Sequence, residues 1–270
     1  MRPLAYFLLI ALLASIAVGP MVQGQVDMQV LLAKQDALKQ NMAALKQTQE
    51  NMKVTLKAIE EKMRAFDKAK ATAKEETVSL PGTNIAKKIT YTDENGNTLT
   101  VYTDASGNPL KSDYYNIATK ETLVEELGKG LVGEFGFPRN AVLTLTTEAG
   151  KILTCGVDSS GNIGTSDYYD PETKNRFVVE CDAAGNVASE KIVDEAQMQE
   201  LTVTNTAAGG STVVFHDVTT GDTLTTRYDR PNGEGKVVAP PVYSKTPGLP
   251  PGTRWCPNTR QWETTKPKPR

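Results

Sequence analysis

The chain has 270 residues, with 30 Lys and Arg against 32 Asp and Glu, so its net charge lies close to zero. One histidine and three scattered cysteines are too few for the usual four-ligand Cys/His zinc site, and we expect no metal and no other cofactor. A pI of about 5.7 without a sustained basic block argues against a nucleic-acid partner.

Residues 1–24 have the pattern of a secretory signal peptide. Arg2 precedes an uncharged apolar run at residues 4–18, which is shorter than the ~20 residues of a membrane-spanning helix. Val22 and Gly24 favour cleavage after Gly24, and an uncleaved anchor is the alternative. No later segment is apolar enough to span a bilayer, so we predict a secreted, extracellular protein with no membrane span after signal cleavage, in which disulfides are permitted.

Residues 25–76 predict one long helix with a seven-residue repeat. The segment lacks Gly, Pro and Cys, and its apolar residues recur with 3-4 spacing over six heptads, as in a coiled coil. We predict that the chain forms a homo-oligomer through this segment. The predicted seam consists of Met28, Leu31, Leu38, Met42, Leu45, Met52, Leu56, Ile59, Met63 and Phe66.

Two glutamines interrupt this seam. Gln35 and Gln49 occupy seam positions, where a buried amide needs a partner and can specify register or the number of helices. The flanking charges favour an antiparallel pair only weakly, because exposed ion pairs contribute about 0.3–0.5 kcal/mol each. The alternative to self-association is that the helix folds back onto the domain that follows.

A linker at residues 77–86 leads to a region, residues 87–238, of Thr- and Val-rich runs separated by Asn-Gly and Gly-Asn turns, which predicts β-hairpins. This region contains an internal repeat: residues 96–120 align without a gap on residues 150–174, and 13 of the 25 positions are identical. The copies lie near residues 87–128 and 141–182, with a degenerate third copy at 201–235.

The repeat carries an Asp-x-x-Gly-Asn turn, for example at residues 104–108 and 158–162. The Asp can cap its own turn, and the Gly can take the positive φ that a short hairpin needs. Binding of Ca²⁺ is the alternative, but each turn offers one reliable carboxylate where calcium takes six to eight oxygens. We predict a segregated α+β protein: a coiled-coil helix, an all-β domain of duplicated hairpin units arranged as a meander, small barrel or sandwich, and a Pro-rich tail.

The repeat also suggests a disulfide. Cys155 and Cys181 of the second copy align with Val101 and Leu127 of the first, so an apolar pair has become a cysteine pair. We predict an intrachain Cys155–Cys181 bond, which would contribute about 3 kcal/mol on the loop-entropy model. Cys256 is then left for an interchain bond, and pairings that use Cys256 within the chain are the alternative.

Residues 239–270 form a Pro-rich tail that contains a Trp/Cys segment, and we predict this tail to be largely disordered. It holds both tryptophans of the chain, Trp255 and Trp262. Together with the outward member of each repeated Tyr pair, Tyr115 and Tyr169, they are the candidate ligand-binding residues. The alternative for the tyrosines is that one of each pair fills the core and the other covers an edge.

The only histidine, His216, precedes Asp217, but neighbouring residues of a strand point to opposite faces, so we predict no catalytic residue and no enzyme. We expect a secreted, non-enzymatic structural or interaction protein of the extracellular-matrix, adhesive or biomineral-associated kind, whose partner is an extracellular matrix protein or a polysaccharide. The alternatives are a carbohydrate-binding module, for chitin as an example, that uses exposed Trp and Tyr, and a secreted enzyme of unknown class.

Overall fold

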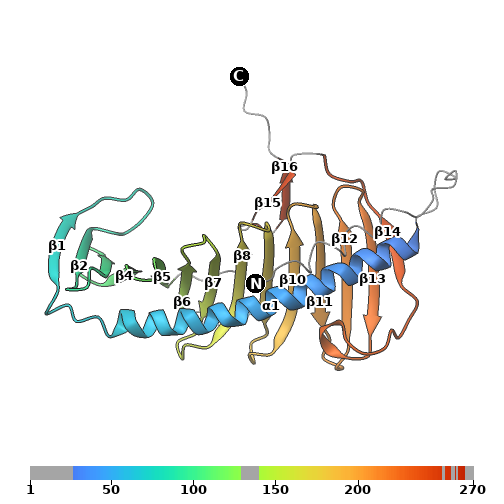
Figure 1. Ribbon diagram of the computed structural model, residues 1–270, viewed down its shortest axis with the longest axis horizontal. Coiled ribbons are helices and arrows are strands. Elements are labelled where there is room, and N and C mark those ends of the chain that lie inside the picture. Colours follow the sequence, from blue (N-terminus) through green and yellow to red (C-terminus); the bar gives the residue numbers. More distant parts are fainter. Residues whose placement is uncertain (1–26, 129–139, 251–252, 257–258, 260, 265–270) are drawn as a thin grey trace, which may run out of the picture.

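The computed structural model describes residues 27–128, 140–250, 253–256, 259 and 261–264. These residues form one long helix, an antiparallel sheet of 14 strands and a separate two-stranded hairpin (Figure 1). In the large sheet every strand pairs with its neighbours in sequence, so the sheet is a meander and the α+β class is confirmed. Within the described residues, no helix has both the length and the apolar character that crossing a membrane requires.

The helix is α1 (Met28–Arg64), and η2 (Pro231–Gly233) is a short 3-10 turn. The strands are β1 (Thr72–Thr77), β2 (Lys87–Thr92), β3 (Thr98–Thr103), β4 (Pro109–Asn116), β5 (Glu121–Leu127), β6 (Ala141–Thr146), β7 (Ile152–Val157), β8 (Ile163–Asp170), β9 (Asn175–Cys181), β10 (Val187–Asp194), β11 (Gln199–Asn205), β12 (Ser211–Asp217), β13 (Asp222–Tyr228), β14 (Val242–Lys245), β15 (Thr253–Cys256) and β16 (Gln261–Thr264).

The helix lies across the strands on one face of the sheet (Figure 1). Its buried residues keep the 3-4 spacing from Leu31 to Met63. Successive buried residues are about 5 Å apart along the helix axis, which is close to the strand spacing of about 4.8 Å. A seven-residue repeat therefore matches a helix that crosses a sheet, because each buried side chain meets roughly the next strand.

The residues of the predicted seam pack against the sheet of the same chain. Eight of its ten residues are buried in a core shared with the sheet, and Met28 and Phe66 pack against that core. In the structure this face packs on the sheet of its own chain, as in the fold-back alternative, and the homo-oligomer through this segment stays a prediction. The physical reason is that the sheet offers an apolar face of matching length in the same chain, with Tyr168, Phe177 and Phe215 fully buried.

The predicted helix is also too long at its C-terminal end. The apolar repeat stops at Phe66, and the helix ends at Arg64. Residues 72–77, which were assigned to the helix or the linker, form the edge strand β1 and pair with β2. Since β1 has no buried residue, its backbone pairing with β2 rather than side-chain burial holds it in the sheet.

The two seam glutamines bind the sheet. Gln35 Oε1 accepts a hydrogen bond from Thr226 Oγ1 at 3.0 Å, and Gln49 Nε2 donates to the Phe177 carbonyl at 3.1 Å. Each bond would be lost if the helix slid along the sheet, and a buried amide without a partner is costly. The glutamines therefore specify the register of α1 on its own sheet.

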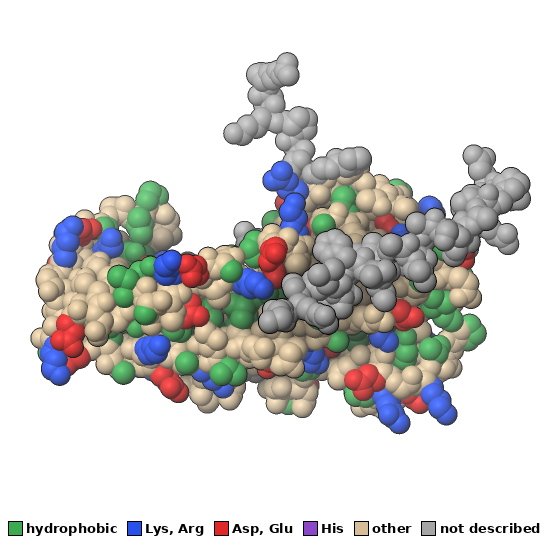
Figure 2. Space-filling view, in the orientation of Figure 1, with side chains coloured by type: hydrophobic (Ala, Val, Ile, Leu, Met, Phe, Trp, Pro, Cys, Tyr) green, Lys and Arg blue, Asp and Glu red, His purple; other side chains and the backbone are tan. Residues whose placement is uncertain are grey.

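Lysines beside the buried stripe add ion pairs with carboxylates of the sheet. Lys34 Nζ lies 2.8 Å from Asp217 Oδ2, and Lys46 pairs with Glu190, whose side chain is buried. Over the helix side of the molecule, Figure 2 shows Lys and Arg side chains interspersed with Asp and Glu. The charges that suggested an antiparallel helix pair thus include residues that pair with the sheet.

The aligned segments of the repeat form matching hairpins, β3–β4 and β7–β8. Both pairings contain a register shift at the same place, after Tyr102 and after Gly156. In each turn the Asp carboxylate accepts two backbone N–H bonds, at 2.9 and 2.8 Å for Asp104 and at 2.8 and 2.9 Å for Asp158. The predicted Asx turns are confirmed.

The predicted Cys155–Cys181 disulfide is wrong, because both cysteines are free. Cys155 on β7 lies opposite Ser166 on β8, which lies opposite Val179 on β9, two residues from Cys181. Two strand spacings place the Cα atoms about 10 Å or more apart, beyond the ~7 Å that a disulfide can bridge. The alignment identified two buried positions on one face correctly but missed the strand between them.

We expect Cys256 to be the only thiol that reacts in the folded protein. Burial raises the pKa of Cys155 to about 12 and also raises the pKa of Cys181, so both stay protonated near neutral pH. Cys256 is partly exposed. Alkylation with iodoacetamide, followed by peptide mass spectrometry, should label Cys256 first and the other two only after denaturation. Equal labelling of Cys155 in the folded state would contradict this.

Candidate functional site

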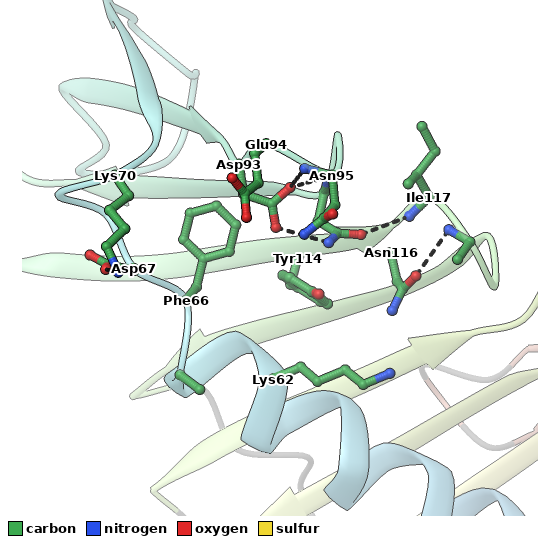
Figure 3. A pocket seen from close by; sticks show the side chains of 13 residues that line it. Lys62, Phe66, Asp67, Lys70, Asp93, Glu94, Asn95, Tyr114, Asn116 and Ile117 are labelled. Carbon is green, nitrogen blue, oxygen red and sulfur yellow. Dashed lines mark hydrogen bonds and ion pairs between the residues drawn. The ribbon is translucent and has the colours of Figure 1, made fainter.

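A pocket of about 660 Å³ opens where α1 ends, between the end of the helix and the turns that follow β2 and β4 (Figure 3). Its volume lies within the range of about 300–1,000 Å³ that is typical of ligand sites. The side chains that give it its chemical character are Lys62, Phe66, Asp93, Glu94, Tyr114 and Asn116.

Two aromatic rings form the wall of the pocket. Phe66, just beyond the end of α1, meets Tyr114 of β4 edge to face, with ring centroids 6.3 Å apart. Burial, and secondarily the negative charge of Asp93, raise the pKa of Tyr114, so its hydroxyl is protonated near neutral pH. The pocket therefore offers an apolar surface beside a neutral hydroxyl group.

Acidic side chains from the turn after β2 lie beside the Phe66 ring (Figure 3). The carboxylate of Asp93 accepts hydrogen bonds from the backbone of Asn95 and from both the backbone and the amide of Asn97, all at 2.8–2.9 Å. Desolvation alone would raise the pKa of Asp93, but these bonds outweigh it and hold the pKa below its usual value. Glu94 is exposed beside it.

The face of the sheet opposite α1 carries the repeated tyrosines. Tyr114 and Tyr168 are buried on the helix side, whereas Tyr115 and Tyr169 are partly exposed on the other face. The pairing register places Tyr115 and Tyr169 in one row across β4 to β8. They are four strand spacings, or about 19 Å, apart. The guanidinium of Arg176 lies 4.8 Å from the Tyr169 ring centroid.

The tryptophans hold the C-terminal hairpin, β15–β16, on that same face. Their rings are 5.8 Å apart, Trp262 Nε1 donates to Glu200 Oε2 at 3.0 Å, and Lys191 Nζ lies 4.5 Å from the Trp255 ring centroid. Trp255 is only 6% exposed, so the prediction that it is an exposed ligand-binding ring is wrong. The apolar area of this pair is used to attach the hairpin to β10 and β11.

The tail is more ordered than the sequence suggested. Of residues 239–270, the described part contains β14, which pairs with β13, and the β15–β16 hairpin. The prediction of a largely disordered tail is therefore wrong for these segments. Proline content pointed to an extended chain, whereas the hydrogen bond and ring contacts of the tryptophans depend on residues more than 50 positions away in sequence.

His216 belongs to this polar cluster. Its Nδ1 lies 3.6 Å from Glu200 Oε1, while Asp217 points to the opposite face and pairs with Lys34, as the strand argument predicted. Lys191 Nζ lies 2.9 Å from Glu200 Oε2. Sequence reasoning did not find the partner of His216, because the two residues face each other across β11 and β12.

We expect the hairpin to detach in strong acid. Burial would raise the pKa of Glu200, but hydrogen bonds from His216, Lys191 and Trp262 outweigh it and lower the pKa from 4.5 to about 2. A lowered carboxyl pKa gives stability that is complete above about pH 4.5 and is lost as the pH falls towards 2. Tryptophan emission reports this directly, since both tryptophans lie in the hairpin, and it should shift to the red over that interval.

A matched variant isolates the carboxylate. Glu200→Gln keeps an acceptor for Trp262 but removes the charge that faces Lys191 and His216, so its emission should be red-shifted already near neutral pH. Far-UV circular dichroism controls for global unfolding. A wild-type transition centred above pH 5, or a Gln variant that is indistinguishable from wild type, would show that Glu200 does not hold the hairpin.

Comparison with known proteins finds no family model that matches the chain and no curated protein that matches its sequence. Within the described residues, no group of three or more His, Cys, Asp or Glu side chains is arranged to hold a metal ion. The pocket at the end of α1 was missed by sequence reasoning. Two signals pointed to it: Phe66 is the last residue of the heptad repeat, and Tyr114 is the inward member of a repeated Tyr pair.

Proposed function

We propose that the chain is a secreted, non-enzymatic interaction protein of the extracellular-matrix, adhesive or biomineral-associated kind, which binds its partner through the sheet face opposite α1. The observation that carries the proposal is that the two faces of the sheet differ in exposure. One face is buried beneath the helix, whereas the row that contains Tyr115 and Tyr169 is partly exposed from β2 to β8.

The geometry of that face suits an extended, repetitive partner. Neighbouring strands are about 4.8 Å apart and alternate residues of one strand about 7 Å apart, so the side chains form a regular array. Threonines recur in it: Thr90 lies 3.2 Å from Thr100, and Thr144 lies 3.4 Å from Thr154, measured between hydroxyl oxygens. Hydroxyl, methyl and aromatic groups occur in this array, so it can both donate hydrogen bonds to a repetitive partner and pack against its apolar surface.

A polysaccharide is the second candidate for the partner, and the shared row of Tyr115 and Tyr169 favours it. Aromatic rings at a fixed separation can stack on separate sugars of one chain, and an exposed aromatic side chain contributes both apolar area and a polar tip. Trp255 no longer supports this candidate, because its ring is buried under the hairpin.

Sedimentation with insoluble matrix and with chitin tests the proposal on the secreted full-length protein. We expect the double variant Tyr115→Ala/Tyr169→Ala to lose retention, and Tyr115→Phe/Tyr169→Phe to keep it if ring contact matters. Gln40→Ala, on the exposed side of α1, is the control and should be retained as wild type is. Retention of the Ala variant at wild-type levels would refute the use of this face.

A further inference from the structure

The second copy of the internal repeat can be compared with the pocket at the end of α1. Tyr114 corresponds to Tyr168 of the second copy. Tyr168 is fully buried beneath α1, and its hydroxyl donates to Asp170 Oδ2 at 3.2 Å. Lys151 Nζ lies 3.1 Å from the same carboxylate oxygen. In the second copy, the tyrosine hydroxyl is thus satisfied within the protein.

The first copy lacks these partners. Asn116 stands at the position of Asp170, and Asn97 at that of Lys151. Tyr114 is only 3% exposed as a residue, and its hydroxyl makes no hydrogen bond to another described residue, but the oxygen itself is not fully buried and opens into the pocket. Asn116 is 6% exposed and accepts bonds from the backbone of Ala118 and Thr119 through Oδ1, which leaves Nδ2 without a partner in the same part of the chain.

Both groups face the pocket, because the helix ends before it can cover them. In Figure 3 the hydroxyl of Tyr114 is directed towards the side of the pocket where Asn116 lies. Water can bond to both groups in the open pocket, and a ligand that displaces this water has to supply the same hydrogen bonds. A hydroxyl and an amide group that have no protein partner among the described residues and open into a cavity therefore indicate a binding site.

The surrounding charges select a neutral ligand. An anion would meet Asp67, Asp93 and Glu94, whereas a cation would meet Lys62 and Lys70, of which Lys70 pairs with Asp67 at 3.2 Å. A neutral ligand with both donors and acceptors can instead accept from Tyr114 and Asn116 and donate to the acidic side. It also needs an apolar group to contact the Phe66 ring.

We propose that this pocket binds an N-acetylated amino sugar, which extends the proposed function by naming a ligand class for a site separate from the tyrosine row. The acetamido carbonyl accepts from Asn116 Nδ2 and from the Tyr114 hydroxyl. Its methyl group packs on Phe66, and its N–H and the ring hydroxyls donate to the carboxylates. A plain hexose offers the hydroxyls but neither the carbonyl nor the methyl group.

Calorimetric titration of the full-length protein with the trisaccharide of N-acetylglucosamine tests the assignment, with the trisaccharide of glucose as the comparison ligand. Asn116→Asp keeps the Oδ1 acceptor of the turn and removes the Nδ2 donor, and Tyr114→Phe removes only a hydroxyl. Each variant should bind about tenfold more weakly, as expected for the loss of one hydrogen bond. Tyr168→Phe, the equivalent change in the second copy, should bind as wild type does, and melting curves verify folding.

Three results would overturn the site: no heat of binding with the N-acetylglucosamine trisaccharide, equal affinity for the glucose trisaccharide, or wild-type affinity in Asn116→Asp. Tyr115→Ala/Tyr169→Ala should leave this titration unchanged. Failure of the pocket is therefore distinguishable from failure of the sheet face, because matrix retention depends on one set of variants and trisaccharide binding on the other.

Discussion

Replacing Leu56 by Ala should destabilise the protein by about 2–5 kcal/mol, because it leaves a cavity between the helix and the sheet. Leu56 is 1% exposed and lies in the buried stripe of α1. Urea denaturation followed by circular dichroism measures the change in the free energy of unfolding. The midpoint should not depend on protein concentration, since the contact lies within one chain.

Val54 gives the matched control, since it lies two residues away on the same helix and is 72% exposed. Val54→Ala should change the free energy of unfolding by no more than about 0.5 kcal/mol. If α1 were instead the seam of an oligomer, dilution would lower the midpoint of both the wild type and the Leu56 variant. Such a concentration dependence would contradict the fold-back arrangement.

Replacing Lys34 by Met should cost about 2 kcal/mol near neutral pH, less than for a fully buried ion pair because Lys34 is partly exposed. Its partner Asp217 is 2% exposed and would keep a buried charge without a cation. Burial alone would raise the pKa of Asp217, but hydrogen bonds from Lys34 and Thr219 outweigh it and lower the pKa. This contribution is present above about pH 4 and is lost as the pH falls through the lowered value, so the variant's deficit should shrink in acid.

A double-mutant cycle separates the ion pair from the turn that Asp217 caps. Asp217→Asn retains an oxygen that can accept from the backbone of Thr219 and Thr220. Lys34→Met should therefore cost much less when it is combined with Asp217→Asn than when it is made alone. Additive losses at neutral pH would mean that Lys34 and Asp217 do not interact in solution.

Local structure was predictable because it depends on neighbours in sequence. The heptad spacing identified the helix and its buried face, and the Asp-x-x-Gly-Asn pattern identified turns such as those at Asp104 and Asp158. The α+β class followed from the separation of a helical from a Thr- and Val-rich region. The packing partner of the helix could not be predicted from the sequence. A 3-4 apolar stripe fits a second helix and a sheet of similar strand spacing equally well.

Long-range contacts escaped prediction for related reasons. The cysteine pair was inferred from two inward positions, but the inference could not show that β8 separates Cys155 from Cys181. The Trp262–Glu200 bond joins residues 62 positions apart. The pocket required three facts together: the end of α1 at Arg64, the ring of Phe66 and the exchange of Asp170 for Asn116 between copies.

The central claim is that α1 forms the second layer of its own chain's sheet, and isotope-mixed cross-linking tests it most directly. Unlabelled and ¹⁵N-labelled chains are mixed after denaturation, refolded together and treated with a carbodiimide, which joins Lys46 to Glu190 when they form an ion pair. Peptide mass spectrometry should find this cross-link only between two light or two heavy peptides. Light–heavy hybrids in the proportion expected for random pairing would show that the helix packs on the sheet of another chain.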